Sequence, residues 1–289
     1  MPTAICLRGA HVKVREFMTK SVITARTNTP LEHVISLLVK YNISRIVITD
    51  DRGRPVGIIT EKDIVKFLSE DISGRGLDEI YAEEVMTKNL ITVSSETDVK
   101  SVAKIMIEKG ISSVVVIGEG GTLEGIITKT DLCRYFACHC RGLCRVSDYM
   151  TREVITVRPT SHIFKVAEIL NKNKISRVVV VENGKPIGII TMADLVSASS
   201  AFKLADWLLS RRVIKVKGKV IRPLQVGLLI ARNLMSHNPI TISEDADLAD
   251  AAHLMVNNGI SGLPVIDKNG KLVGIITKTD IIKAVRDLS

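Results

Sequence analysis

A threonine and an aspartate three positions apart are the residues of this sequence best suited to chemistry, and they recur four times in one phrase. The phrase reads GIITEKD at 57–63, GIITKTD at both 125–131 and 274–280, and GIITMAD at 188–194. A threonine can cap the N-terminus of a helix while an acidic residue three positions later accepts a hydrogen bond from the cap's backbone. A helix N-terminus also attracts phosphate, and a carboxylate can accept bonds from both ribose hydroxyls. A helix cap and a nucleotide site both fit this spacing.

Each phrase belongs to a longer repeat. Every repeat carries an Ile-Ser pair, a threonine 19 residues before that pair in an apolar run, and a methionine six residues before the threonine. The Ile-Ser serines are Ser44, Ser112, Ser176 and Ser261; the threonines are Thr24, Thr92, Thr156 and Thr241; the methionines are Met18, Met86, Met150 and Met235. Four segments that agree at four landmarks indicate a fourfold repeat.

The elements that must position these residues follow one order in every repeat. A short β-rich run such as VITAR precedes a helical stretch such as LEHVISLLVKYN, with apolar residues three and four apart. In the first repeat Thr29, Pro30 and Glu32 are expected as N-cap, first and third residues of this helix. A strand such as ISRIVITD, a Gly-containing turn, the strand GIIT and a final helix complete the order β-α-β-β-α.

Composition sets the outer limits. The 289 residues suit two domains, and 46% hydrophobic with 3% aromatic residues predicts cores of Ile, Val, Leu and Met. No apolar run approaches the roughly 18 residues of a membrane span, and the N-terminus lacks a signal-peptide segment. We therefore expect a cytoplasmic protein with no membrane partner. The net charge of +9 favours an anionic partner, which includes phosphates, nucleic acid and acidic proteins.

The repeat order and the T-x-x-D phrase after a hairpin resemble cystathionine β-synthase (CBS) domains over nearly the whole chain. The resemblance implies an α+β fold of four CBS repeats that pair as two Bateman modules in a flat disk, as in the γ subunit of AMP-activated protein kinase and its archaeal relatives. The expected segments are repeats at 14–70, 81–140, 146–200 and 226–289, with a basic insert at 201–225.

The pairing of repeats can be inferred from what they share. Repeats 1 and 3 both have an arginine after the Ile-Ser pair (Arg45 and Arg177), and both have a proline before the last strand (Pro55 and Pro186). They also share an arginine two residues after the first-strand threonine. Repeats 2 and 4 lack all three features and share the KTD ending. This is the pattern that duplication of a two-repeat module would leave, so we expect repeat 1 to pair with 2 and repeat 3 with 4.

The resemblance also implies which residues line the ligand clefts. The aspartates would bind the ribose, the first-strand backbone the adenine edge, the Ile-Ser serines the base pocket, and cationic side chains the phosphates. The candidates from the phrases are Thr60, Asp63, Thr128, Lys129, Thr130, Asp131, Thr191, Asp194, Thr277, Lys278, Thr279 and Asp280. The candidates elsewhere are Ile23, Ile91, Ile155, Ile240, Ser44, Arg45, Ser112, Ser176, Arg177 and Ser261. Each cationic residue could equally be a solvated surface residue, and Ser113 and Gly262 replace the arginine in repeats 2 and 4.

Four cysteines crowd into the stretch CRYFACHCRGLC, namely Cys133, Cys138, Cys140 and Cys144. Thiolates beside His139 could bind zinc or an iron–sulfur cluster, but the spacing matches no standard metal motif. Structural thiols are therefore the preferred interpretation, and no metal site is assigned.

The insert contains SRRVIKVKGKVIRP at 210–223, which predicts a basic hairpin with a reversal at Lys-Gly. A solvated hairpin is preferred over a protein-partner surface, and nucleic acid is the least favoured, since Trp207 and Phe202 are the only nearby aromatic residues.

No catalytic motif such as GxSxG, HExxH or Walker A occurs, so an enzyme is not expected. The sequence predicts a regulatory sensor of AMP, ADP or ATP that requires no cofactor. A protein partner is expected but not identified, and homodimerisation stays open. The alternatives are a nucleic-acid-binding protein that uses the basic hairpin, and a regulator that responds to S-adenosylmethionine or to a metal.

Overall fold

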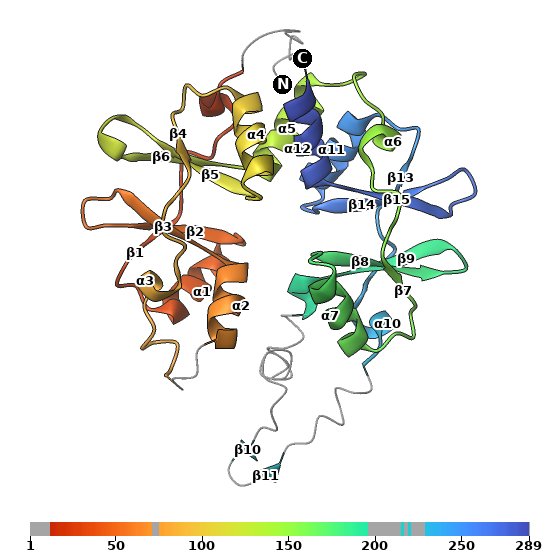
Figure 1. The fold of residues 1–289 in the computed structure, drawn as a ribbon, viewed down its shortest axis with the longest axis horizontal. Helices are drawn as coiled ribbons and strands as arrows, with labels where there is room; N and C mark the ends of the chain where they lie inside the picture. The colour runs from red at the N-terminus through yellow and green to blue at the C-terminus, as the bar shows by residue number, and fades with distance from the viewer. Residues whose placement is uncertain (1–11, 71–74, 196–214, 217–218, 221–228, 289) are drawn as a thin grey trace. The chain divides into compact units, whose positions relative to one another are not determined.

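The computed structural model describes residues 12–70, 75–195, 215–216, 219–220 and 229–288 (Figure 1). The chain divides into two compact units, one comprising Met1–Cys140 and Ile281–Ser289 and the other Arg141–Asp280. The first unit holds repeats 1 and 2 together with residues 281–289, and the second holds repeat 3 and the rest of repeat 4, which agrees with the predicted pairing of repeat 1 with 2 and of repeat 3 with 4. Within the described residues, no helix is long and apolar enough to cross a membrane.

The first repeat forms a three-stranded sheet with two helices. Its elements are β1 (Thr24–Arg26), α1 (Leu31–Lys40), β2 (Arg45–Thr49), β3 (Pro55–Thr60) and α2 (Glu61–Glu70). Strand β1 runs parallel to β2, which pairs antiparallel with β3 across a tight hairpin. The parallel pair follows from the α1 crossover, because parallel strands cannot be joined by a short turn.

The predicted start of α1 was wrong by one residue. The N-cap is Pro30, whose backbone is extended (φ −58°, ψ 143°), and the helix begins at Leu31. The hydroxyl of Thr29 instead accepts a 2.9 Å bond from the backbone N–H of Arg26 and closes the turn after β1. A threonine side chain can serve a turn as well as a helix, and the tertiary path of the chain selects the turn here.

The second repeat has the same order, preceded by a short helix. Its elements are α3 (Ala82–Val85), β4 (Thr92–Val93), α4 (Val99–Glu108), β5 (Ser113–Ile117), β6 (Leu123–Thr128) and α5 (Lys129–His139). A one-turn helix, Glu119–Gly121, lies in its hairpin, and another, Val14–Glu16, begins the first repeat. The α+β order β-α-β-β-α predicted from the sequence is confirmed in this unit.

Repeats 3 and 4 have the same architecture, although residues 281–287 of their last helix belong to the first unit. Repeat 3 contains α6 (Val146–Tyr149), β7 (Thr156–Val157), α7 (Ile163–Lys172), β8 (Arg177–Glu182), β9 (Lys185–Thr191) and a helix whose described part is 192–195. Repeat 4 contains α10 (Ala231–Leu234), β12 (Ser236–His237), β13 (Ile242–Ser243), α11 (Leu248–Asn257), β14 (Gly262–Ile266), β15 (Leu272–Thr277) and α12, which begins at Lys278 and ends at Asp287.

Within the basic insert, β10 (Lys215–Val216) pairs antiparallel with β11 (Lys219–Val220), as the hairpin prediction requires. The rest of 210–223, including Arg211, Arg212 and Lys217, lies outside the described residues, as do Phe202 and Trp207.

The two repeats of a unit exchange the segments that precede their first strands. The Thr19 segment pairs with β6 of repeat 2 through two backbone bonds to Ile126, of 2.9 and 3.0 Å. In return, the Thr87 segment pairs with Ile58 on β3 of repeat 1, through bonds of 2.9 and 3.1 Å. The second unit does the same, since Thr151 pairs with Ile275 on β15 and β12 pairs with β9. Neither repeat therefore completes its own sheet.

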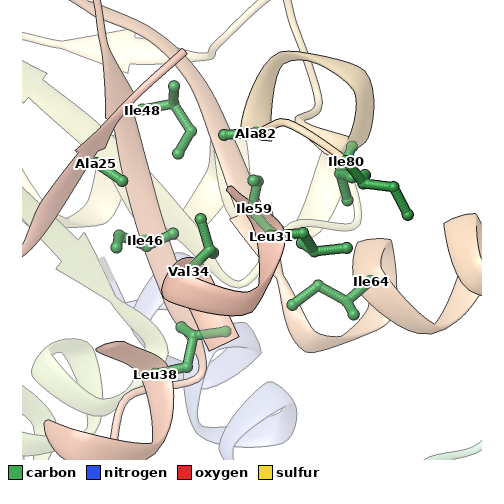
Figure 2. Packing of buried hydrophobic residues seen from close by; sticks show 11 residues of the cluster. Ala25, Leu31, Val34, Leu38, Ile46, Ile48, Ile59, Ile64, Ile80 and Ala82 are labelled. Atoms are coloured by element: carbon green, nitrogen blue, oxygen red, sulfur yellow. The ribbon is translucent and has the colours of Figure 1, made fainter. Parts of the chain in front are cut away.

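The core of repeat 1 shows the same exchange (Figure 2). Leu31 and Val34 of α1 pack with Ile46, Ile48 and Ile59 of the sheet, and all five are buried. Ile80 and Ala82, from the segment that leads into repeat 2, complete this cluster (Figure 2). Burial of a side chain such as Ile80 contributes about 1.5–3 kcal/mol relative to exposure, so the exchanged segment is held by hydrophobic burial as well as by backbone bonds.

Candidate functional site

Two clefts lie among the described residues of the first unit, and the larger of these two is built by both repeats. Its cavity volume is about 430 Å³. Thr60 and Asp63 line it at the point where β3 ends and α2 begins, and Ile91 and Ser112 line it from repeat 2. The phrase of one repeat therefore faces the first strand and Ile-Ser pair of the other. A cavity of this size is within the range of small-molecule sites, about 300–1,000 Å³.

Asp63 caps its own helix and also faces this cleft. Its Oδ2 accepts a 2.8 Å bond from the backbone N–H of Thr60 and a 2.6 Å bond from the Thr60 hydroxyl. Its Oδ1 accepts a longer bond, 3.2 Å, from the hydroxyl of Thr87 on the exchanged segment. One carboxylate oxygen thus serves the cap while the other meets only a weaker hydroxyl contact at the cleft wall. The helix-cap and ligand interpretations are compatible at this residue.

In the smaller cleft the roles of the two repeats are reversed, so the phrase of repeat 2 faces the first strand and Ile-Ser pair of repeat 1. Its cavity volume is about 240 Å³, and it is lined by Ile23 and Ser44 from repeat 1 and by Thr128 and Thr130 from repeat 2. The unit therefore has two clefts related by exchange of the repeats. They differ in size and in the side chains presented.

The carboxylate of Asp131 is less accessible to a ligand than the carboxylate of Asp63. Only 3% of its surface is exposed, and it is not among the described residues that line the smaller cleft. Its Oδ2 accepts bonds of 2.8 and 2.7 Å from Thr128, while its Oδ1 accepts a 2.9 Å bond from Arg134 one turn along α5. The group is nearly buried and its Oδ1 already accepts a bond from a charged donor, so a ribose would have to compete with Arg134 for this oxygen.

Arg45 lies between the two clefts and lines both. Its guanidinium donates to the carbonyl and hydroxyl of Ser112, at 2.8 and 3.2 Å, and to the hydroxyl of Ser44, at 2.9 Å. Burial lowers the pKa of Arg45, and the nearby carboxylates of Asp131 and Glu61 oppose this shift. The side chain stays charged, because an arginine pKa remains far above neutral.

The second unit places the corresponding residues in the same relationships. Asp194 accepts bonds of 2.7 and 2.6 Å from Thr191, and Asp280 accepts bonds of 3.0 and 2.7 Å from Thr277. Arg177 donates a 2.7 Å bond to the hydroxyl of Ser261 in repeat 4. The remaining candidates lie at matching positions: Ile155 before β7, Ile240 before β13, Ser176 before β8, and Lys278 and Thr279 in the first turn of α12.

A family model described as "CBS domain" matches residues 14–70, 82–138, 146–201 and 231–287. These matches cover most of the sequence. The chain belongs to the CBS domain family. Proteins of this family are typically regulatory, and this chain is a CBS-domain regulatory protein.

Two solved structures show the same fold over almost the whole chain. Protein MJ1225 of Methanocaldococcus jannaschii, described as a proposed archaeal homologue of g-AMPK, has a TM-score of 0.73 at 23% identity and covers 94% of this chain and 99% of its own. An uncharacterised conserved protein of Pyrococcus horikoshii has a TM-score of 0.67 at 19% identity and covers 95% and 100%. By sequence, MJ1225 is 26% identical over 276 residues, which are 91% of this chain and 95% of the relative.

The four clustered cysteines of this CBS protein differ in solvent exposure. Cys133 and Cys140 are buried, Cys138 is exposed and Cys144 is half-buried. Among the described residues, no three His, Cys, Asp or Glu side chains are grouped so as to hold a metal ion. The phenol of Tyr135 lies against Cys140, and burial raises the pKa of Tyr135 to about 12, with Cys140 and Asp98 adding to the shift.

Sequence reasoning missed three residues of these CBS clefts. Thr87 reaches Asp63, Arg134 pairs with Asp131, and Lys62 lines the larger cleft. Two of them carried a signal in the sequence. A threonine or serine follows every one of the four landmark methionines, and Arg134 stands three residues after Asp131, a spacing at which opposite charges meet on a helix.

Proposed function

We propose that this CBS protein binds adenine nucleotides in the two clefts of its first unit and signals their presence by a shift between conformations. The observation that carries the proposal is the larger cleft, where a partly exposed carboxylate, the N-terminus of α2 and an arginine converge on one cavity of about 430 Å³.

Each part of a nucleotide has a chemical counterpart in this cleft. Oδ1 of Asp63 would accept bonds from the ribose hydroxyls, in exchange for the 3.2 Å bond from Thr87. The phosphate would lie near Arg45 and Lys62, where the dipole of the ten-residue helix α2 also favours negative charge. The backbone at Ile91 would take the edge of the base, and Ile111 would contact its face.

Regulation would follow from linkage. A ligand that binds two conformations with different affinity shifts their populations, and a protein partner that contacts one conformation responds to the shift. AMP, ADP and ATP are the proposed ligands, and no further cofactor is proposed. S-adenosylmethionine shares the adenosine group, so titration must separate it from the nucleotides.

The test is isothermal titration of ligand-stripped protein with AMP, ADP, ATP and S-adenosylmethionine. An Asp63→Ala variant should bind AMP in the larger cleft at least about tenfold more weakly, because hydrogen bonds to a charged group contribute roughly 1.5–3 kcal/mol each. Absence of binding by all four ligands in the unmodified protein would overturn the proposal.

Asp98→Ala is the matched control. Asp98 caps α4 of the same unit by accepting a 2.8 Å bond from the backbone N–H of Lys100, and it lines neither cleft. Both variants lose a helix cap, which costs about 0.5–2 kcal/mol of stability. Equal loss of AMP binding in both would mean that Asp63 acts through stability alone.

A further inference from the structure

We propose that Arg45 is a single anion-binding group shared by the two clefts of the first unit, so that a phosphorylated ligand in one cleft weakens the binding of a phosphorylated ligand in the other. This inference rests on the proposed function, and it adds a rule of interaction between the two sites.

The sharing is visible in the residues that line each cleft. Ser44 and Arg45 are the residues common to both linings. The corresponding arginine is missing from repeat 2, where Ser113 begins β5 and lines the larger cleft. Two clefts related by exchange of the repeats would each receive an arginine if both repeats carried one. The first unit has one such arginine, Arg45, for both clefts.

The two clefts depend on Arg45 to different degrees. The larger cleft is also lined by Lys62, which carries a second positive charge. Among the described residues that line the smaller cleft, Arg45 is the only lysine or arginine. Withdrawal of Arg45 toward the larger cleft would therefore leave the smaller cleft without a cation on its wall.

Arg45 is positioned so that its guanidinium could bind an anion in either cleft. Its guanidinium has five N–H donors, and they make four hydrogen bonds to the serines on its two sides, with donor–acceptor distances of 2.8–3.3 Å. Bidentate binding of a phosphate would have to exchange at least one of these bonds. Its charge is balanced from both sides, by Asp131 of the repeat 2 phrase and by Glu61 on the wall of the larger cleft.

The sign of the coupling follows from charge. A phosphate beside Arg45 neutralises its single positive charge and adds negative charge between the clefts, so a second phosphate gains less and is repelled more. Coupling of this kind is reciprocal, and couplings between sites are typically about 5–150-fold in affinity. Adenosine carries no phosphate, so its binding to the two clefts should be independent.

The experiment follows each cleft separately in the full chain. Ile23 lines only the smaller cleft and Ile91 only the larger, so their methyl resonances in isoleucine-labelled protein, assigned by Ile→Val substitution, report the two occupancies. Asp63→Ala weakens AMP binding in the larger cleft by at least about tenfold, so the smaller cleft is titrated while the larger cleft is mostly empty. The AMP affinity reported by Ile23 should then rise, by about fivefold or more, although the substitution removes a binding group.

Two further variants isolate the arginine. In the Asp63→Ala background, Arg45→Ala should abolish the rise, whereas Arg45→Lys, which keeps the charge, should retain part of it. When adenosine is titrated in place of AMP, Asp63→Ala should not raise the affinity reported by Ile23, whether residue 45 is arginine or alanine. Arg177 holds the corresponding position in the second unit, so Arg177→Ala is the control that should leave the Ile23 and Ile91 titrations unchanged.

The outcomes separate this inference from the proposed function. If AMP shifts both methyls but Asp63→Ala leaves the Ile23 affinity unchanged or lower, the sharing of Arg45 is wrong and nucleotide binding stands. The same holds if adenosine shows the same rise as AMP. If saturating AMP shifts only one of the two methyls, the unit has one nucleotide cleft rather than the proposed two, and the sharing of Arg45 is wrong. If AMP shifts neither methyl, both the proposed function and this inference are wrong.

Discussion

The sulfur of Met86 lies where a methyl group on Gly57 would have to be. Met86 comes from the exchanged segment of repeat 2, and Gly57 opens the phrase of repeat 1. The same relationship joins Met18 to Gly125, Met150 to Gly274 and Met235 to Gly188. The two landmarks that recur in the sequence are therefore the two sides of one contact, and that contact joins the repeats of each unit.

Gly57→Ala should destabilise the first unit by about 1–3 kcal/mol, the usual cost of overpacking a filled space. Met86→Ala should be destabilising by itself, because it removes side-chain volume that is partly buried against the core of repeat 1. The double variant should be more stable than the sum of the two costs predicts, since the alanine methyl occupies space that Met86 has left. Urea unfolding of the four proteins measures the coupling.

A strictly additive result from this set would contradict the contact as the reason for the glycine. Gly125→Ala provides a comparison with a different obstacle, because its methyl would approach the backbone carbonyl oxygen of Thr19 at 2.8 Å. No side-chain truncation can relieve that clash, so Met18→Ala should rescue Gly125→Ala less well than Met86→Ala rescues Gly57→Ala.

Gly262→Ala should displace Arg177 from Ser261, because a methyl on Gly262 would overlap the Arg177 guanidinium. We expect a loss of about 1–3 kcal/mol from overpacking. The loss should be largely absent when Arg177 is alanine. Unfolding of the two single variants and the double variant tests this, and an undiminished effect of Gly262→Ala in the Arg177→Ala background would contradict it.

Asp50 should make the stability of the first unit sensitive to acid. The backbone N–H of Arg54 is the main cause of its lowered pKa, and the Arg54 side chain and the Arg52 N–H add to it. A carboxylate whose pKa is lower in the folded state stabilises the fold above its unfolded pKa, about 3.9. This contribution is lost as pH falls through the folded pKa.

Asp50→Asn should therefore unfold at lower urea than the unmodified protein at pH 7, and the difference should shrink below about pH 4. Asp267, whose pKa is lowered chiefly by the Lys271 N–H, should behave alike in the second unit. Asp51→Asn is the neighbouring control, because the Asp51–Arg26 ion pair is exposed on both sides and should contribute within about 1 kcal/mol. A difference for Asp50→Asn that persists unchanged at pH 3 would contradict the assignment.

Tyr135 should produce the opposite dependence at high pH. Between about pH 10, where an unfolded tyrosine ionises, and its folded pKa of about 12, the folded state keeps a proton that the unfolded state has lost. Stability should fall as pH rises through this range. Tyr135→Phe should remove that slope, and absorbance at 295 nm should show one of the four tyrosines ionising near 12 in the unmodified protein. An unchanged slope in Tyr135→Phe would place the ionisation elsewhere.

The sequence determined the repeat, the order of its elements and the pairing of the repeats. Periodic apolar residues and Gly-containing turns are local signals, so the α1 helix and the β2–β3 hairpin could be predicted without any long-range contact. The start of α1 was predicted wrongly because Thr29 can bond either to its own helix or to a turn, and both choices look alike in sequence.

Only the tertiary structure decided which halves form a cleft. Asp63 faces Ile91 and Ser112 of the other repeat, and Ile23 and Ser44 face Thr128, because each repeat completes its sheet with a segment from its partner. The structure also showed that Asp63 and Asp131 differ in accessibility. They share the same local motif, but different side chains pack beside them. A motif specifies the bonds within one turn of chain, whereas burial and a neighbouring cation depend on residues far away in sequence.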